Sequence, residues 1–438
     1  MSSGISEVGL RARRRIALRL LPFVFVLYVI AYIDRTNVSF AGLRMNADLG
    51  FSETVFGLGI GIFYVTYVLF EIPGALIVER WSARKWTARI MISWGVVTVL
   101  TAFVRTPGEF YVARLFLGAA EASFFPGMIV YLTHWFRVSD RCRAIACLYA
   151  AVPAASLFGS PLAGWLLGVH WLNLAGWRWL FIAEGIPAIV FGLITVFYLT
   201  DRPSQARWLP QDEQQWINEE LRLEVQAKKR VRDFTILQAL GDRHVLLLTL
   251  TWFLALSGYL GNVYWIPTFV KRLSGLSDRS VSLLMLIPAC IGIAGTLLNG
   301  WHSDKSGERQ KHMVAPLLFG AVCYGLLIVA HPGPAVSVFT LLFVTGVVYA
   351  YLPVFWSMPT MMLSGPAAAA AFGLINSTGQ LGGLAGPFLI GFFNQRTHSL
   401  TTSFACVALA YVAASALVLT LKIRNPLDAS PLANQPEN

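Results

Sequence analysis

Hydrophobic residues gather in stretches of roughly 20 residues that recur along the chain and are separated by short polar segments. A helix rises about 1.5 Å per residue, so each stretch is long enough to cross the hydrocarbon core of a membrane, which is about 30 Å thick. We therefore expect an all-α membrane protein with twelve transmembrane helices, at roughly residues 17–41, 53–79, 86–104, 109–135, 142–168, 177–199, 245–271, 279–302, 313–331, 335–361, 367–394 and 401–423.

One long polar break, residues 200–244, interrupts this pattern after the sixth stretch. Within it, "QDEQQWINEELRLEVQAKKR" starts acidic and ends basic, which suits the dipole of a helix. The break contains no phosphate-binding loop, histidine cluster or nucleophile motif. The pattern thus predicts a six-helix bundle over 1–199, a linker over 200–244 and a second six-helix bundle over 245–438.

The two halves resemble each other. "GALIVERWSARK" follows the second stretch and "GWHSDKSGERQK" follows the eighth, and their glycines, Gly74 and Gly300, are 226 residues apart. Pro161 in "GSPLAG" and Pro387 in "AGPFLIG" have the same separation. Two matches at one offset indicate two pseudo-symmetric bundles, as in many secondary transporters.

Composition supports the membrane interpretation, because 56% of the residues are hydrophobic and only 13% are charged, against about 25% charged in soluble domains. Of the 34 Lys and Arg residues, 25 lie in or beside alternate loops and termini, seven lie in or beside the other loops, and two, Arg35 and Arg114, lie well inside the stretches. This asymmetry places both termini and the linker in the cytoplasm. It also explains the net charge of +11 without nucleic acid. We expect a multi-pass protein of the cell (inner or plasma) membrane.

The five cysteines are scattered, without the spacing of metal ligands. No sequence motif indicates a catalytic residue, a metal site or a cofactor. We therefore expect a protein that is not an enzyme and that needs no cofactor. The acidic residues inside the spans, described next, indicate a transmembrane proton gradient as its energy source.

Four charged residues lie well inside the first and fourth predicted spans: Asp34, Arg35, Arg114 and Glu121. Such a residue costs about 2.5–3.5 kcal/mol on insertion scales and normally faces protein or a water-filled cavity. Asp34 and Arg35 are adjacent and project about 100° apart on a helix, so they cannot pair well with each other. Arg114 and Glu121 are two turns apart and share one face.

Depth suggests how these charges are arranged. At about 1.5 Å per residue, Asp34 and Arg114 lie at matching depths, and Glu121 lies near the midplane. We therefore expect an Asp34–Arg114 ion pair, which leaves Arg35 without a fixed partner and available to a substrate carboxylate. Protonating both acids would leave two uncompensated arginines, a receptor for an organic anion. A purely structural ion-pair network is the alternative.

Other polar residues inside the spans are candidates for hydrogen bonds to a substrate: Tyr67, Tyr259, Asn376 and Gln380. Asn376 and Gln380 are one turn apart and share a face. Contacts between helices are the alternative for each of them. Glu71 and Glu184 have no evident charge partner at their depth, so we interpret both as structural.

"GWHSDKSGER" resembles the loop signature of the major facilitator superfamily, G-x-x-x-D-[RK]-x-G-x-[RK]. Its glycine would let two helices approach closely, and its charges would form a network at the cytoplasmic mouth. The first-half copy departs from the signature, since its acidic and basic residues stand one position late and the second glycine is absent. Ordinary cytoplasmic charges are the alternative. The candidate gating residues are Gly300, Asp304, Lys305, Gly307 and Arg309, with Glu79 and Arg80 in the first half.

A closer resemblance is carried by "YIDRTNVSFA", "YVLFEIPGALIVER", "RLFLGAAEASFFPG" and "GWRWLFIAEGIP" followed by "LTDRPSQARWL". Together they resemble the anion:cation symporter family, in particular its branch that imports tartrate-, phthalate- and allantoate-like compounds. The resemblance implies a proton-coupled importer, with Arg35 as the substrate arginine and with Asp34 and Glu121 as the acids that handle protons.

The sequence thus predicts symport of a small organic anion, such as a hydroxy-dicarboxylate, aromatic acid or sugar acid, by a monomer in the lipid bilayer. A proton antiporter that exports a drug or metabolite and a sodium-coupled anion importer remain open. A sensor or scaffold would need an appended domain, which neither the linker nor the tails would hold.

Overall fold

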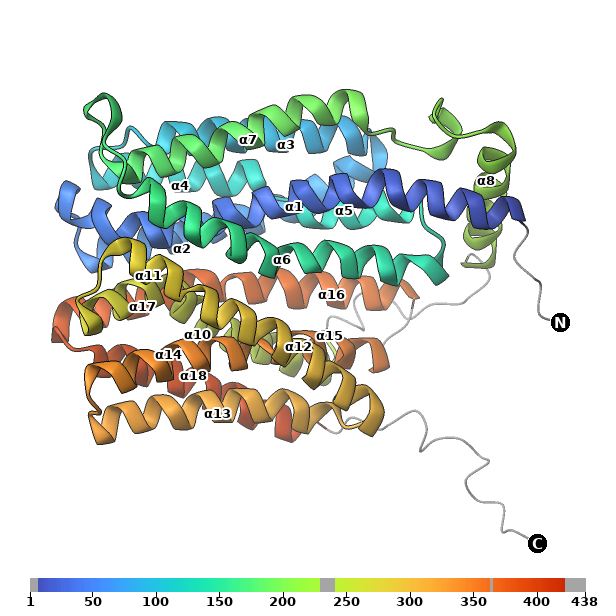
Figure 1. The fold of residues 1–438 in the computed structure, drawn as a ribbon. Coiled ribbons are helices and arrows are strands. Elements are labelled where there is room, and N and C mark those ends of the chain that lie inside the picture. The colour runs from blue at the N-terminus through green and yellow to red at the C-terminus, as the bar shows by residue number, and fades with distance from the viewer. Residues whose placement is uncertain (1–6, 229–240, 363–364, 422–438) are drawn as a thin grey trace, which may run out of the picture. The chain divides into compact units, whose positions relative to one another are not determined.

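The computed structural model describes residues 7–228, 241–362 and 365–421. Apart from two single turns of 3₁₀ helix, its regular elements are α-helices (Figure 1). The α-helices are α1 (Glu7–Leu49), α2 (Glu53–Arg80), α3 (Ala83–Thr101), α4 (Pro107–Glu121), α5 (Phe124–Thr133), α6 (Val138–Leu166), α7 (Gly176–Tyr198), α8 (Gln211–Lys228), α10 (Arg243–Ser274), α11 (Asp278–Leu284), α12 (Leu286–Ser306), α13 (Arg309–Ala330), α14 (Pro334–Tyr349), α15 (Tyr351–Met362), α16 (Gly365–Gln380), α17 (Gly382–Thr397) and α18 (Leu400–Thr420).

These helices give the twelve predicted spans once interrupted helices are counted together: α4 with α5, α11 with α12, α14 with α15, and α16 with α17. Among the described residues, ten spans are long and apolar enough to be recognised by hydropathy, and α3 and the α16–α17 span are not among them. The sequence pattern predicted each of the four interrupted spans as one continuous helix, and this prediction was wrong. Between α4 and α5, Ser123 has a φ of 67°, a left-handed conformation that breaks the helical hydrogen-bond ladder.

Helix ends are specified by the sequence around them. Thr106 accepts a hydrogen bond from the backbone N–H of Glu109, whose carboxylate accepts one from the N–H of Arg105. Two amides near the start of α4 that lack partners in the helix are satisfied in this way. Asp242 caps α10 similarly, through the N–H groups of His244 and Val245.

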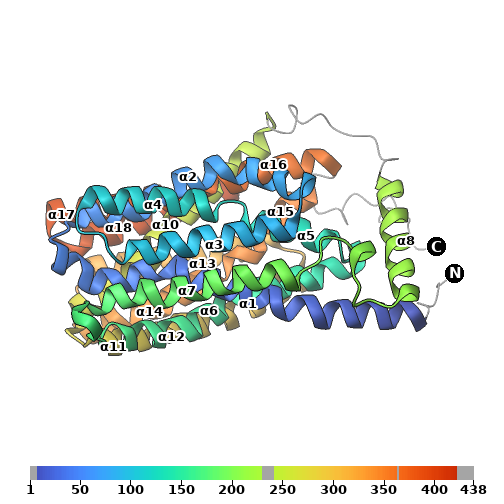
Figure 2. The same cartoon turned by 90° about the horizontal axis from the view of Figure 1, so that it is seen from above.

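The chain divides into two compact units. The first comprises residues 1–51, 62–232 and 277–283, and the second comprises 52–61, 233–276 and 284–438. In the first unit, α3 lies along α7, and α1 packs against α6 and α7 (Figure 2). In the second unit, α10 packs against α14, α16, α17 and α18, and α13 lies against α18.

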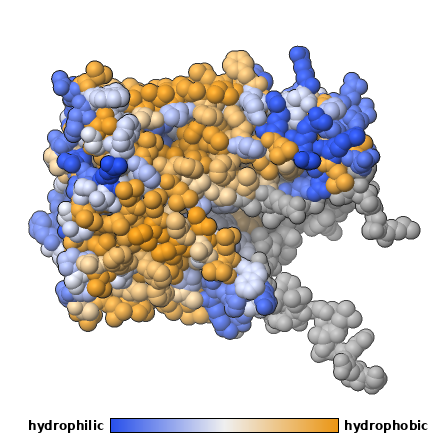
Figure 3. Space-filling model, viewed as in Figure 1, coloured by the Kyte–Doolittle hydropathy of each residue, from blue (hydrophilic) through white to orange (hydrophobic). Residues whose placement is uncertain are grey.

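The outer surface has the distribution expected of a protein surrounded by lipid. On the face drawn in Figure 3, hydrophobic residues cover the sides of the helices, and hydrophilic residues gather near their ends. Large apolar side chains point outward, including Phe197 at 86% exposure and Val329 at 81%. Exposed apolar area of this extent is stable only against hydrocarbon. The chain is a multi-pass membrane protein.

The linker contains a helix that docks on the first unit. At the end of that unit where α1 begins, α8 lies across the other helices (Figures 1 and 2). Glu213, only 1% exposed, forms an ion pair of 3.0 Å with Arg15 of α1. Arg11 of α1 pairs with Asp212 at 3.0 Å. The linker is therefore more than the plain connection that its composition indicated.

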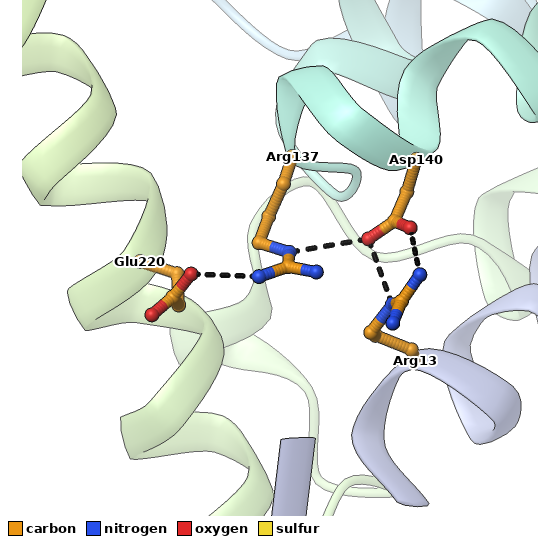
Figure 4. A network of polar contacts seen from close by, with 4 residues as sticks. All are labelled: Arg13, Arg137, Asp140 and Glu220. Atoms are coloured by element: carbon orange, nitrogen blue, oxygen red, sulfur yellow. Dashed lines mark hydrogen bonds and ion pairs between the residues drawn. The ribbon is translucent and has the colours of Figure 1, made fainter. Parts of the chain in front are cut away.

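A four-residue network, which we call the linker clasp, completes this docking (Figure 4). Arg137 donates to Glu220 of α8 at 2.9 Å and to Asp140 at 3.1 Å, and Asp140 also accepts two hydrogen bonds from Arg13 of α1. Burial lowers the pKa of Arg137, but its hydrogen bonds with Glu220 and Asp140 outweigh burial and raise it. The clasp thus connects α1, the start of α6 and α8.

Candidate substrate and proton site

Arg35 of α1 and Glu121, the last residue of α4, form an ion pair between Nη2 and Oε1. The Arg35 side chain keeps 15% of its surface exposed, and that of Glu121 keeps 2%. The expectation that Arg35 lacks a fixed partner was wrong. Counting depth along straight spans overlooked the reach of the long arginine side chain, which brings its guanidinium to a carboxylate deeper in the membrane.

Asp34 is 1% exposed and accepts a hydrogen bond of 3.2 Å from Asn37 Nδ2 at Oδ1, while its Oδ2 has no hydrogen-bond partner. The expected Asp34–Arg114 ion pair is therefore not formed. The guanidinium of Arg114 instead lies over the ring of Phe63, with Cζ 4.9 Å from the ring centroid. Matching depth did not determine the direction in which each side chain points.

Three aromatic rings surround the Arg35 guanidinium and form what we call the aromatic cage. Its Cζ lies 5.4 Å from the ring centroid of Tyr32, 5.8 Å from that of Phe63 and 5.1 Å from that of Tyr67. Tyr67 is 2% exposed. Aromatic faces attract cations, so the cage holds the guanidinium where water cannot solvate it fully.

A close approach between α2 and α4 brings these groups together. A Cβ atom added at Gly118 would lie 2.1 Å from the carbonyl oxygen of Phe63, a distance that no side chain tolerates. Beside it, the hydroxyl of Thr66 donates to the carbonyl of Leu115 at 2.7 Å. Gly118 thus lets α4 touch α2 and places Glu121 within reach of Arg35.

The second unit holds the other substrate candidates. Tyr259 of α10 is half-buried, with its ring 5.6 Å from that of Tyr349. Asn376 and Gln380 are half-buried on α16. By contrast, Asn262 is buried and joins helices, since it donates to Thr345 and accepts from Tyr324.

The loop motif of the second half differs from expectation at its first glycine. A Cβ atom at Gly300 would meet nothing within 4 Å, so this residue does not mediate a close helix approach. Gly307 has a φ of 70° and caps α12. Arg309 donates to the hydroxyl of Ser303 at 3.0 Å, and Lys305 lies over the ring of Trp301. The side chains of Asp304, Glu79 and Arg80 lie outside the described part of the structure.

Several side chains that contact the four charges were not predicted from the sequence. Tyr32 precedes Arg35 by three residues and Phe63 precedes Tyr67 by four, so helical spacing alone could have indicated the cage. Asn37 follows Asp34 by three residues, so the same argument could have indicated it. Glu184 was interpreted as structural from the sequence, because the groups that it interacts with, Asp34 and Asn37, come from another helix. Within the described residues, no three His, Cys, Asp or Glu side chains are grouped to hold a metal ion.

Comparison with known proteins gives a consistent result. The sequence profile described as Major Facilitator Superfamily matches residues 24–387. A protein of Agrobacterium vitis described as "Putative tartrate transporter" is 43% identical over 433 residues, which cover 98% of this chain and 98% of that protein. A protein of Acinetobacter baumannii described as "Quinolone resistance transporter" is 37% identical over 388 residues, which cover 88% and 89% of the two chains.

Among solved structures, the crystal structure of a D-xylose-proton symporter matches with a TM-score of 0.73. The match covers 93% of this chain and 98% of that one, at 16% sequence identity. At this identity the likeness concerns the fold, which agrees with the twelve spans and with the repeat between the halves.

Proposed function

The chain belongs to the major facilitator superfamily, and on that premise we propose that it imports a small organic anion together with protons. Membership of a family of transporters makes it a transport protein and not an enzyme. The relative described as a tartrate transporter favours hydroxy-dicarboxylates among the anions to be tested first. The surplus of Lys and Arg in alternate loops of this chain supports an orientation in the inner membrane with both termini in the cytoplasm. We expect the protein to act as a monomer.

The observation that carries this proposal is the ion pair between Arg35 and Glu121. A carboxylate of the substrate and the carboxylate of Glu121 would compete for the same guanidinium. A proton on Glu121 removes its charge and weakens its hold on Arg35. The freed guanidinium then binds a substrate carboxylate through two parallel hydrogen bonds. Proton binding and anion binding are coupled because they act on one residue.

Asp34 supplies a second place for a proton. Its carboxyl group is buried, and one of its oxygens has no hydrogen-bond partner, so its ionised form is poorly stabilised. With Asp34 and Glu121 ionised, the four charges of the site sum to zero. With both protonated, Arg35 and Arg114 leave two positive charges, which match a dianion. Protons that enter with the substrate thereby offset the cost of moving an anion through a medium of low dielectric constant.

Two other modes of transport fit the same fold. The Acinetobacter relative described as a quinolone resistance transporter favours a proton antiporter that exports a drug or metabolite. A sodium-coupled importer would use the same carboxylates for a different cation. An exporter would be favoured by a buried acid without an arginine partner, whereas Glu121 pairs with Arg35.

Uptake by purified protein in lipid vesicles tests the proposal. An inward proton gradient in sodium-free buffer should drive accumulation of radiolabelled tartrate, and a proton ionophore should abolish it. A screen of other hydroxy-dicarboxylates, aromatic acids and sugar acids by thermal shift would identify the best anion. Accumulation that requires sodium at fixed pH would favour the sodium-coupled importer. Export of a quinolone driven by protons moving in the opposite direction, without anion uptake, would favour the antiporter.

A further inference from the structure

A row of two cations and two indole rings lies at the start of α3. Lys85 Nζ is 5.9 Å from the ring centroid of Trp81. Arg89 Cζ is 3.9 Å from the ring centroid of Trp86, and the centroids of the two indole rings are 6.3 Å apart. We call these four residues the α3 stack. It shares no residue with the site described above, and the proposed transport mechanism leaves it without a role.

The start of α3 belongs to the end of the first unit from which the linker leaves. Asp201, in the polar segment after α7, accepts hydrogen bonds of 2.8 Å from the hydroxyl of Ser82 and from the backbone N–H of Arg84. One oxygen of this carboxylate thus satisfies an amide in the first turn of α3, and the other holds its N-cap residue. The distribution of Lys and Arg assigns the linker, and with it this end of α3, to the cytoplasm.

The ring of Trp86 is held in place from inside the unit. Its indole N–H donates to the hydroxyl of Ser123 at 3.2 Å. A Cβ atom at Gly74 would lie 2.1 Å from the same Ser123 oxygen, so the absence of a side chain there lets α2 approach this hydroxyl. The surface on which Arg89 stacks is therefore fixed by contacts that do not involve Arg89.

Both cations lie on the exposed face of α3. Helical spacing places on this one face Lys85, Arg89, Val96 and Leu100. Val96 is 42% exposed and Leu100 59%, whereas other faces of the helix pack against α4, α5 and α7 of the same unit. Apolar side chains exposed to this extent on a spanning helix contact hydrocarbon. We infer that Lys85 and Arg89 stand at the cytoplasmic edge of a lipid-facing stripe.

Arg89 lacks an acidic partner at this place. Its side chain is half-buried, and its Nε has no hydrogen-bond partner. Among the residues that the structure describes, no carboxylate pairs with Arg89 or Lys85. Arg89 follows the N-cap Ser82 by seven residues, about 10 Å along the helix. A cation at this depth is costly unless it reaches polar surroundings, and the ring of Trp86 supplies only part of them.

We propose that the α3 stack binds the phosphate group of an anionic phospholipid in the cytoplasmic leaflet. The planar guanidinium of Arg89 holds two phosphate oxygens in parallel while one of its faces rests on Trp86. Lys85, one turn nearer to the cytoplasm, adds a second positive charge. Trp81 is 61% exposed and lies at the level of the headgroups, where indole rings are stable.

The position of the α3 stack favours a lipid over a soluble phosphate. A soluble phosphate would gain only the contacts with the two cations. A phospholipid also places its acyl chains along the exposed apolar face of α3, where Val96 and Leu100 lie. The inference does not depend on which anion the protein transports or on how that transport is driven.

Native mass spectrometry of the purified protein, titrated with phosphatidylglycerol, tests this site without any transport assay. The wild type should retain one tightly bound phosphatidylglycerol. Arg89→Gln should weaken its binding about 10-fold, because charge-assisted hydrogen bonds to the phosphate are lost. Lys85→Gln should weaken it about 5-fold. An affinity of Arg89→Gln equal to that of the wild type would overturn the inference.

Arg396→Gln is the matched control. Arg396 also stacks on a ring, since its Cζ is 4.8 Å from the ring centroid of Phe392, but it lies in the last turn of α17. The charge distribution assigns that turn to the side of the membrane opposite to the linker. Phosphatidylglycerol binding should therefore be unchanged. An equal loss in Arg396→Gln and Arg89→Gln would reflect net charge alone and would overturn the site.

Arg89→Lys keeps the charge but not the planar fork, so its affinity for phosphatidylglycerol should fall about 3-fold. Thermal unfolding without added lipid checks that each variant is folded. If Arg89→Gln does not fold, Arg89→Lys decides the matter, and an unchanged affinity in that variant overturns the inference.

Two competitors identify the ligand. Phosphatidylcholine carries the same phosphate without a net charge and should bind about 5-fold more weakly than phosphatidylglycerol. Inorganic phosphate should not displace bound phosphatidylglycerol. Displacement by inorganic phosphate would make the ligand a soluble anion, and equal affinity for phosphatidylcholine would remove the preference for anionic lipid. Either result overturns the proposal.

Discussion

Arg35 and Glu121 form an ion pair in which the carboxylate is almost completely buried, whereas the guanidinium keeps 15% of its surface exposed. The pair is therefore accessible from the arginine side. An arriving anion can contact Arg35 before Glu121 has released it. This asymmetry makes Arg35 the residue to test for substrate binding and Glu121 the residue to test for proton coupling.

Arg35→Lys should abolish transport while leaving expression and folding intact. Lysine keeps the charge but cannot hold a carboxylate bidentately, and we expect a loss in uptake of about 100-fold, equivalent to roughly 2.7 kcal/mol. Uptake in vesicles and thermal unfolding are the measurements. Arg222→Lys, in the exposed Arg222–Glu219 pair of α8, is the matched control. Near-normal uptake by Arg35→Lys would refute the substrate role.

Glu121→Gln imitates the protonated acid permanently. Because Arg35 would then have no competing carboxylate, the variant should bind the anion at alkaline pH at least as well as the wild type. It should exchange labelled for unlabelled anion across the membrane, yet fail to accumulate anion in response to a proton gradient. Counterflow and gradient-driven uptake, measured side by side, check this. Gradient-driven accumulation at the wild-type rate would remove Glu121 from the coupling mechanism.

Substitutions at Tyr67 separate the contribution of its ring from that of its hydroxyl. Tyr67→Phe keeps the ring 5.1 Å from the guanidinium, and transport should stay within twofold of the wild type. Tyr67→Leu removes the cation–π interaction, which is worth about 0.5–2 kcal/mol, so anion affinity should fall by roughly 2- to 30-fold. If Tyr67→Phe is as impaired as Tyr67→Leu, the hydroxyl and not the ring is the important group.

Gly118→Ala tests the close approach of α2 and α4. Its Cβ atom would collide with the carbonyl oxygen of Phe63, so the helices must separate, at a cost of about 1–3 kcal/mol. We expect a lower melting temperature and reduced uptake. Gly325→Ala in α13 is the control, because nothing lies within 4 Å of its added atom. Equal stability of the two variants would contradict this description of Gly118.

High salt should weaken the docking of α8 by the linker clasp, whereas alkaline pH should leave it unchanged. The pKa of Arg137 is raised, so the stability that its charge contributes is fully present below the ordinary pKa of an arginine and is lost only above it. Amide hydrogen exchange in α8 should therefore be similar at pH 7 and at pH 9, after correction for intrinsic rates, and faster in high salt. Asp140→Asn should accelerate it at every pH, since Asp140 binds both Arg13 and Arg137.

The sequence predicted the number of spans, the family and the four buried charges, because each of these leaves a mark on composition or spacing. It did not predict which charges pair. Asp34 and Arg114 match in depth, but pairing depends on the direction of each side chain, and that depends on the contact at Gly118 and on the rings of Phe63 and Tyr67. Glu184 was interpreted as structural for the same reason, since the groups that it interacts with, Asp34 and Asn37, are distant along the chain.

The aromatic cage also bears on the speed of the transport cycle. A guanidinium that left one carboxylate for another across bare hydrocarbon would pass through an isolated cation, and such a step would be slow. The faces of Tyr32, Phe63 and Tyr67 contact Arg35 while it holds Glu121, and contacts kept during the exchange would lower this barrier. We therefore expect the rearrangement of helices, and not the exchange of anions at Arg35, to limit turnover.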